Sequence, residues 1–297
     1  MQDEAYIIKN IGDIELKTLV LGAKGMAGHI IYNRLVRDGH AVLGTSRFAE
    51  SYEDRNLIKF DALDKHTWFE FLNGVEVDVV INCIGMLVKA CENNIQDAIT
   101  VNTLLPKFLE GFYKESNTQV IHISTDCVFS GKVGDYTEDT LPDETHIYGK
   151  SKHRGEIRNE KDLTIRTSII GLELEDKPNA SDNSGLINWL LSQPKGSCIQ
   201  GYSECYWSGI STLELADAIV WYLENPSHGL HQVSRDKKIS KFDLLTLAND
   251  VFERELIIEV SSEKKVDKSL IPSEKAFKIE ASYLEMLERM RLERKSK

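Results

Sequence analysis

The chain has 297 residues, of which 41% are hydrophobic and 28% charged, which is typical of a globular protein and excludes a disordered, collagen-like or coiled-coil chain. Its 36 basic and 47 acidic residues give a net charge of −11. We therefore expect no nucleic-acid or membrane partner, although a small anionic ligand needs only a few local cations. The N-terminus is acidic, no apolar run reaches the roughly 18 residues of a membrane span, and the five cysteines lack the spacing of a zinc site. These features predict a cytoplasmic protein with reduced cysteines and no metal.

Up to about residue 171, short β-branched runs alternate with longer amphipathic stretches, which is typical of βαβ units around a parallel sheet. The predicted strands are residues 18–21, 41–44, 57–60, 77–81, 119–123 and 163–167. The predicted helices are residues 26–38, 94–114, with a kink near Pro106, and 147–159. The fold class is therefore α/β, a doubly wound parallel sheet of the Rossmann type.

Beyond residue 171 the pattern loosens, and the polar stretch 173–184 is predicted to be a loop. Further helices are predicted at residues 186–191, 213–224, 241–252 and 282–297, the last opening with a capping box of Ser282 and Glu285. We interpret residues 17–171 as a dinucleotide-binding domain. Residues 172–297 would form a smaller, mainly helical substrate lobe that can return strands to the sheet.

Three glycines, Gly22, Gly25 and Gly28, stand between the first predicted strand and the first helix. Their GxxGxxG spacing is a variant of the dinucleotide fingerprint, in which one glycine allows the tight turn, one lets the backbone approach a pyrophosphate, and one lets the helix pack on the sheet. The helix N-terminus then faces the phosphates. A glycine trio alone can be a simple turn, but the strand–turn–helix context predicts a dinucleotide site.

The second predicted strand leads into Ser46 and Arg47, where an acidic residue would bind a ribose 2′-hydroxyl. A guanidinium and hydroxyls suit a 2′-phosphate, because the guanidinium can donate two parallel hydrogen bonds. The sequence therefore favours NADP(H) over NAD(H). The alternative is that Arg47 is a solvated loop cation.

Tyr148 and Lys152 are four residues apart and share one face of a predicted helix. A phenol has a reference pKa of about 10, and a neighbouring ammonium can lower it toward the range useful for proton transfer. Thr125 directly follows the fifth strand, at the sheet edge where open α/β sheets bind ligands. This trio predicts reduction of a carbonyl group, with Tyr148 as the proton donor and Thr125 as a hydrogen-bond partner of the carbonyl oxygen.

The runs Ile123–Gly131, Tyr148–Glu156, Arg166–Ser168 and Val80–Gly85 together resemble the dTDP-4-dehydrorhamnose reductase family of extended short-chain dehydrogenases. The match covers about residues 17–233. The resemblance implies Thr125, Tyr148 and Lys152 as the catalytic trio. It implies a cofactor site lined by Tyr148, Lys152 and the residues Gly22, Gly25, Met26, Gly28, Ser46, Arg47, Asp61, Ala62, Cys83, Ile84, Gly85 and Asn102. Substrate contacts are expected from Met86, Asp126, Val128, Phe129 and Trp207.

Single residues in this set have simpler interpretations. Asp61 can equally be a helix N-cap, and Trp207 alone is more typical of a core aromatic. Cys83 and Cys127 are interpreted as small packing residues, because nothing places a base beside them.

The resemblance implies NADPH-dependent reduction of a keto group, at C4, on a nucleotide-diphospho-sugar of the 6-deoxy type, by an enzyme that is often a homodimer. Cys127 replaces an aromatic residue of many family members, and Ile210 and Ser211 replace the usual Pro-Thr, so the identity of the sugar stays open. Cys127 also replaces the second acid that a dehydratase would need. Two alternatives remain: an epimerase on the same scaffold, and a non-catalytic regulatory subunit similar to that of methionine adenosyltransferase.

Overall fold

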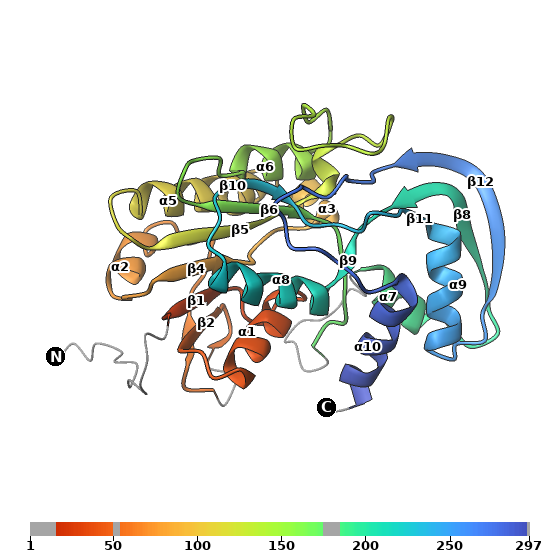
Figure 1. The fold of residues 1–297 in the computed structure, drawn as a ribbon, viewed down its shortest axis with the longest axis horizontal. Helices are drawn as coiled ribbons and strands as arrows, with labels where there is room; N and C mark the ends of the chain where they lie inside the picture. The colour runs from red at the N-terminus through yellow and green to blue at the C-terminus, as the bar shows by residue number, and fades with distance from the viewer. Residues whose placement is uncertain (1–15, 50–53, 175–184, 296–297) are drawn as a thin grey trace.

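A seven-stranded parallel sheet forms the centre of the molecule, in the order β10-β6-β5-β4-β1-β2-β3. The computed structural model describes residues 16–49, 54–174 and 185–295 (Figure 1). The sheet consists of β1 (Thr18–Leu21), β2 (Val42–Ser46), β3 (Leu57–Lys59), β4 (Val79–Asn82), β5 (Gln119–Thr125), β6 (Leu163–Thr167) and β10 (Gly229–Gln232). The six predicted strands and the parallel α/β fold are confirmed. The strand order reverses between β1 and β4, where ligands bind in open α/β sheets.

Helices cover both faces of this sheet (Figure 1). On one side lie α1 (Gly28–Arg37) and α8 (Thr212–Glu224), and on the other lie α5 (Leu105–Phe112) and α6 (Ile147–Gly155). Every residue of β1 and β4 is buried, which explains why these strands read as continuous apolar runs. Two short helices were not predicted, because six residues give too little periodicity. They are α2 (Trp68–Asn73) and α3 (Val88–Asn93), while α4 (Ile95–Ile99) lies within the helix predicted over residues 94–114.

The long helix expected over residues 94–114 is interrupted. It consists of α4, a π-helical turn at Thr100–Leu104, and α5. Pro106 lies in the first turn of α5 and has no N–H to donate to the carbonyl of Asn102, so the regular ladder breaks there. The predicted kink near Pro106 is confirmed, and it places Asn102 in the π-helical turn.

The part of the chain after residue 171 contains a second sheet as well as helices. Its strands have the order β11-β8-β12, and Figure 1 shows β8 and β12 curving around α9 at the right. The elements are β7 (Ile169–Ile170), α7 (Leu186–Ser192), β8 (Cys198–Trp207), β9 (Ile210–Ser211), β11 (Ile239–Ser240), α9 (Lys241–Val251), β12 (Ile257–Asp267) and α10 (Tyr283–Lys295). The long strands β8 and β12 were not predicted. In β12 most residues are exposed and many are charged, so this strand lacks the alternation of a half-buried strand.

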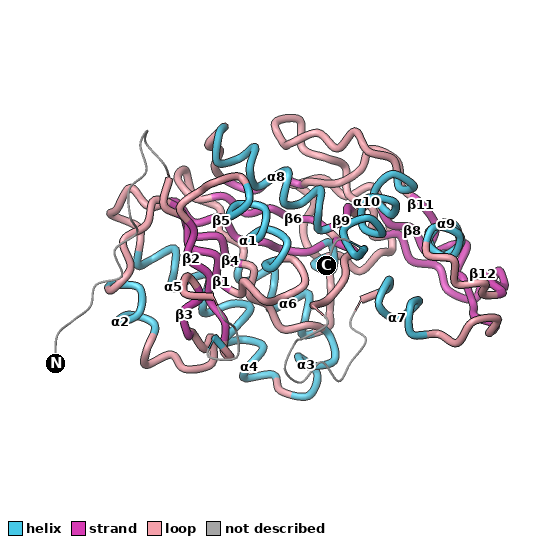
Figure 2. The backbone as a smooth tube through the Cα atoms, turned by 90° about the horizontal axis from the view of Figure 1, so that it is seen from below, coloured by secondary structure: helices cyan, strands magenta, loops and turns pink. Residues whose placement is uncertain are grey.

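One hydrophobic core joins the first sheet to the C-terminal elements. It runs from Ile31 and Leu35 of α1 to Leu215 of α8 and Met286 of α10, and the two views agree that α1 and α8 lie side by side (Figures 1 and 2). The capping box of α10 is confirmed, because the Ser282 amide donates to Glu285 at 2.6 Å and the Glu285 amide donates to Ser282 at 3.2 Å. Among the described residues, no helix is long and apolar enough to cross a membrane.

Candidate active site

The turn after β1 depends on its glycines. Gly22 has a φ of +81°, a conformation that L-residues with a Cβ rarely adopt. A Cβ at Gly28 would lie 2.0 Å from the carbonyl oxygen of Gly22, so only glycine lets α1 start this close to the strand. A Cβ at Gly25 would meet only that same oxygen, at 3.4 Å. The structure thus places the backbone around Gly25 where a ligand can approach it.

The ends of β2 and β3 lie next to this turn. The Ala23 amide donates to the carbonyl of Thr45 at 2.9 Å, so the turn is attached to the end of β2. Arg47 is exposed, with its guanidinium 5.6 Å from the Phe48 ring. Ser46 accepts a hydrogen bond from the Phe48 amide. Asp61 accepts one from the Leu63 amide and so caps a turn, while the neighbouring Ala62 is buried; the N-cap of α2 is Thr67.

The segment after β4 lies opposite the glycine turn and is fixed by Asn102. The Cys83 amide donates to the carbonyl of Leu21 at 3.0 Å, and Ile84 is the nearest contact that a Cβ at Gly22 would make. Asn102 is fully buried and holds Met86 from both sides, accepting from its amide at 2.8 Å and donating to its carbonyl at 3.1 Å. The same side chain donates to Ser151 of α6 at 3.1 Å. Asn102 thus ties this segment to the helix that carries Tyr148.

Thr125 and Tyr148 meet at the carboxyl end of β5. A hydrogen bond with Thr125 lowers the pKa of Tyr148, but burial has the larger effect and raises that pKa above its ordinary value. Thr125 accepts a hydrogen bond from the Cys127 amide and donates to Asp126, each at 3.1 Å. Burial also raises the pKa of Cys127, and of Cys83, to about 12, so both thiols stay protonated near neutrality.

Lys152 lies one helical turn beyond Tyr148 on α6, but its side chain is bound to β5. Its Nζ donates to the carbonyl oxygen of Ile123 at 2.6 Å and lies 3.4 Å from Nε2 of His122. Burial lowers the pKa of Lys152 to about 8. We predicted that the Lys152 ammonium lowers the pKa of Tyr148, and this prediction is corrected here. Burial is the largest effect on the pKa of Tyr148, and the Nζ of Lys152 is directed at β5 instead.

Two glycines allow α6 to lie close to these groups. A Cβ at Gly149 would stand 2.1 Å from the carbonyl oxygen of Cys127, and one at Gly155 would stand 2.0 Å from the carbonyl oxygen of Asn102. Each contact is with backbone, which cannot move aside cheaply. Gly149 therefore sets the distance between α6 and the segment that follows β5, and Gly155 sets the distance between α6 and the π-helical turn.

Apart from Met86, which Asn102 holds, the expected substrate contacts divide into two groups. Asp126 and Trp207 are both nearly buried and lie near one cation, Lys241 of α9. The Nζ of Lys241 is 4.9 Å from the Trp207 ring centroid. Burial lowers the pKa of Lys241, and the charge of Asp126 opposes that effect. The structure therefore brings residues of both sheets together beside Thr125.

Val128 and Phe129 form the second group and are packed inside the protein. Both have no exposed surface and belong to a small core with Tyr136 and Leu270. The Phe129 ring stacks on Tyr136 with centroids 4.1 Å apart, and its other neighbour is the buried Arg166 guanidinium at 5.0 Å. The expectation that these two apolar side chains contact the substrate is corrected, since enclosed side chains offer no surface to a ligand.

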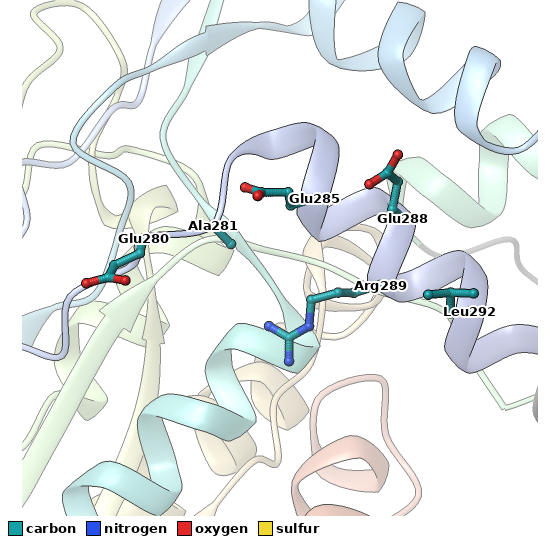
Figure 3. Close-up of a pocket in the computed structure, with 6 residues that line it drawn as sticks. All are labelled: Glu280, Ala281, Glu285, Glu288, Arg289 and Leu292. Atoms are coloured by element: carbon teal, nitrogen blue, oxygen red, sulfur yellow. The ribbon is translucent and has the colours of Figure 1, made fainter.

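A hollow of about 410 Å³ lies elsewhere, between α10 and the segment before it (Figure 3). No predicted site residue lines it. Its lining consists of Glu280, Ala281, Glu285, Glu288, Arg289 and Leu292. Three carboxylates around one guanidinium suit an anionic nucleotide poorly.

Two buried polar residues beside the site were missed by the sequence interpretation. Asn82 at the end of β4 and His122 in β5 are both fully buried and lie 3.2 Å apart, between Nδ2 and Nδ1. The available signal was a polar residue inside an apolar strand, since buried polar groups require partners.

The residues around the glycine turn fit a dinucleotide. Gly25 leaves its backbone approachable, Gly22 and Gly28 hold the turn and helix in place, and Arg47 adds an exposed cation at the end of β2. A side chain larger than hydrogen at Gly25 would occupy the space in front of the turn. These observations agree with phosphate groups binding at the start of α1.

This strand order, the glycine turn after β1 and the Tyr148–Lys152 helix beside β5 define the extended short-chain dehydrogenase/reductase class. The chain belongs to the RmlD substrate binding domain family, whose model matches residues 16–173.

Known relatives agree with this assignment. Over 179 residues the chain is 34% identical to the probable low-salt glycan biosynthesis reductase Agl14 of Haloferax volcanii, and the match covers 58% of this chain and 59% of that protein. The match thus spans less than two thirds of this relative. Methionine adenosyltransferase 2 subunit beta of Xenopus tropicalis is 23% identical over 80% of this chain and 72% of its own length. A solved structure of a hypothetical dTDP-4-dehydrorhamnose reductase from Sulfolobus tokodaii superposes with a TM-score of 0.74, at 27% identity, covering 90% of this chain and 98% of that one.

Proposed function

We propose that this protein is an NADPH-dependent reductase of the C4 keto group of a nucleotide-diphospho-6-deoxy-sugar, acting in deoxysugar or polysaccharide precursor biosynthesis. The observation that carries the proposal is the placement of Thr125 and Tyr148 together at the carboxyl end of β5, with Lys152 one turn away. Family membership and the names of the relatives support the substrate class.

Tyr148 is the proton donor in this mechanism. The phenol carries its proton near neutrality and can pass it to a carbonyl oxygen. The Thr125 hydroxyl, whose one hydrogen is donated to Asp126 in this structure, would turn it to the same oxygen and keep that oxygen in line with the phenol. NADPH, when bound, supplies the hydride that the carbonyl carbon accepts. Lys152 is the third member of the trio and exchanges its proton within the buried site.

The proposed cofactor site runs along the carboxyl ends of β1, β2 and β4. The turn from Gly22 to Gly28, with Met26, would receive the pyrophosphate, and Ser46 and Arg47 the 2′-phosphate. Asp61 and Ala62 would flank the adenine. Cys83, Ile84 and Gly85 would line the opposite wall, held by Asn102, with Tyr148 and Lys152 at the nicotinamide end.

The proposed substrate side faces the part of the chain after residue 171. Met86, which is partly exposed, and Asp126 would contact the sugar nucleotide, and the nearby Lys241 adds a cation suited to an anionic substrate. Trp207 is packed in the core beside Tyr283 and would support this side from behind. Residues 172–297 would then act as the substrate lobe, and residues 17–171 as the dinucleotide-binding domain.

A binding role without turnover is a second candidate. The observation in its favour is the similarity to methionine adenosyltransferase 2 subunit beta over 80% of this chain. A purely regulatory chain has no need of Thr125, Tyr148 and Lys152, all of which this chain retains.

The decisive experiment follows NADPH absorbance with a panel of 4-keto and 4-hydroxy nucleotide sugars, while product is measured by chromatography. A reductase consumes one NADPH per sugar converted. An epimerase forms product with no net consumption, and a regulatory protein forms no product. Product that accumulates at constant NADPH absorbance contradicts the proposed function.

A further inference from the structure

A chain of buried hydrogen bonds runs from the end of β4 to the side chain of Lys152. The backbone amide of Ile84 donates to Oδ1 of Asn82 at 3.1 Å, and Nδ2 of Asn82 lies 3.2 Å from Nδ1 of His122. Nε2 of His122 lies 3.4 Å from Nζ of Lys152, which donates to the Ile123 carbonyl at 2.6 Å. Asn82 and His122 have no exposed surface, and Lys152 has 5%, so water cannot replace these partners.

The backbone amide of Ile84 determines the tautomer of His122. Because the Ile84 amide is a donor, the oxygen of Asn82 must face it, and the NH₂ group must face His122. Nδ1 of His122 then accepts, so the imidazole carries its proton on Nε2. If the ring were doubly protonated, its Nδ1–H would face the NH₂ group of Asn82, and two donors would oppose each other. Burial and the charge of Lys152 also hold the pKa of His122 well below its ordinary value.

The Nε2–H group of His122 therefore points at Nζ of Lys152. An ammonium can only donate, whereas a neutral amine has a lone pair that accepts from Nε2–H. The amine can still donate to the Ile123 carbonyl, so both of its contacts are satisfied only in the neutral form.

We propose that His122, oriented by Asn82 and the Ile84 amide, is a positioning residue that favours the neutral amine of Lys152 and so makes this lysine ready to exchange a proton. This inference rests on the proposed function for the role of Lys152 in turnover, but the coupling between the two side chains can be measured without it.

The other charged and titratable groups around this pair are few among the described residues. Glu156, just beyond α6, raises the pKa of Lys152, as do the thiols of Cys83 after β4 and Cys91 of α3. Lys107 of α5 lowers the pKa of His122, and Glu156 raises it. Burial is the largest effect on both side chains, and the contact with His122 acts on Lys152 in the same direction.

The first test reads the tautomer of His122 by ¹⁵N NMR of the imidazole nitrogens. We expect a neutral ring protonated on Nε2 across the stable pH range. Asn82→Asp replaces the donor NH₂ with an acceptor oxygen and keeps the acceptor for Ile84, so the proton should move to Nδ1. A wild-type ring protonated on Nδ1, or charged at neutral pH, overturns the proposal.

The second test measures the pKa of Lys152 by NMR of ¹³C-labelled lysine, with Lys152→Met used to assign the signal. In His122→Phe the pKa should rise by about one pH unit, the equivalent of one lost hydrogen bond to the amine. His122→Gln should also raise the pKa of Lys152, because the glutamine amide can turn its oxygen toward the ammonium. This variant replaces His122→Phe if the latter does not fold. The matched control is His231→Phe, which removes another buried imidazole, bonded to Tyr222 at 2.9 Å, and should leave Lys152 unchanged.

Turnover then separates the two proposals. In the His122 variants, the limb of the kcat–pH profile that reports Lys152 should move upward with the measured pKa. If the pKa moves and no nucleotide sugar consumes NADPH, the coupling stands and the proposed function fails. If NADPH is consumed and the pKa of Lys152 stays within about 0.3 unit of wild type in both variants, a shift small against one hydrogen bond, the positioning role of His122 fails.

Discussion

Tyr148 illustrates how burial decides what a side chain can do. Compared with a phenol in water, Tyr148 has a raised pKa, because burial outweighs the opposing effect of Thr125. The four-residue spacing between Tyr148 and Lys152 predicts a lowered pKa for the phenol instead. In the proposed mechanism, this half-buried phenol keeps its proton until a carbonyl oxygen develops negative charge beside it.

Replacing Tyr148 by phenylalanine removes the proton donor and keeps the ring. We expect turnover to fall at least about 10²-fold, the scale of general acid catalysis, with NADPH affinity nearly unchanged, measured by steady-state kinetics and cofactor titration. Tyr113→Phe is the matched control, because the Tyr113 hydroxyl is buried without a hydrogen-bond partner and its loss should cost nothing. Wild-type turnover in Tyr148→Phe would refute the mechanism.

Arg47 is the residue that should distinguish the two cofactors. Arg47→Ala should weaken NADPH binding about ten- to a hundredfold, the equivalent of a charge-assisted hydrogen bond, and leave NADH binding nearly unchanged. Fluorescence titration with each cofactor measures this, with Arg37→Ala as the control, since its side chain is 66% exposed on α1. Equal losses for both cofactors would show that Arg47 does not contact the 2′-phosphate.

At the scale of elements, the position of α6 depends on its contact with the end of β5. Gly149→Ala places a methyl group 2.1 Å from the Cys127 carbonyl oxygen, so α6 must move outward and take Tyr148 with it. We expect a loss of about 1–3 kcal/mol in unfolding free energy and a fall in kcat of more than about tenfold, because misplacing a reacting group by about 1 Å is costly. Gly111→Ala in α5 is the control: a Cβ there meets nothing within 4 Å, so stability should rise slightly. Equal urea midpoints for the two variants would contradict the contact.

The end of α6 is held to β6 by a buried ion pair. Both Nε and Nη2 of Arg166 donate to Glu156, at 2.9 and 2.8 Å, and the side chain of Arg166 is fully buried. Burial raises the pKa of Glu156, but the hydrogen bonds from His153, Arg166 and Arg158 and the charge of Arg166 together hold this pKa far below its ordinary value. A depressed carboxyl pKa stabilises the fold above the pKa of the unfolded state, about 4.3, and this stabilisation is lost as pH falls toward the folded pKa.

Glu156→Gln should therefore destabilise the protein by about 3–5 kcal/mol near pH 7, because it leaves the Arg166 charge buried without its counter-ion. The difference from wild type should shrink as pH falls below about 4. Urea unfolding across pH measures it, with the exposed ion pair of Lys195 and Glu255 as control through Glu255→Gln, which should change stability by under about 1 kcal/mol. A pH-independent difference would show that the charge of Glu156 is not responsible.

At the scale of the whole molecule, the division at residue 171 crosses a continuous core. β10 pairs with β6 over Gly229–Gln232, and α8 and α10 share a hydrophobic cluster with α1. Arg34 of α1 and Arg289 of α10 both bind Asp217 of α8. Two lobes joined in this way are expected to unfold together.

We therefore expect one urea transition when unfolding is followed at Trp68, in α2, and at Trp207, at the end of β8, in variants that retain only that one of the four tryptophans. A fragment of residues 16–173 should fail to reach a native near-UV spectrum, since it exposes the face of α1 that α8 and α10 cover. Two separate transitions, or a folded fragment, would contradict a single cooperative unit.

The sequence by itself determined the parallel sheet, the glycine turn, and the placement of Thr125 after β5 and of Tyr148 and Lys152 on one helix, because hydrophobic periodicity and backbone conformation are local properties. It also determined the capping box of α10 and the break at Pro106, which depend on residues within one turn of each other. Only the tertiary structure decided that β8 and β12 pair, that Val128 and Phe129 are enclosed, and that Lys152 is bound to β5 beside His122. These features depend on burial and on partners far away in sequence, such as Leu270 beside Phe129, 141 residues apart, and desolvation acts on a side chain only after distant segments have closed around it.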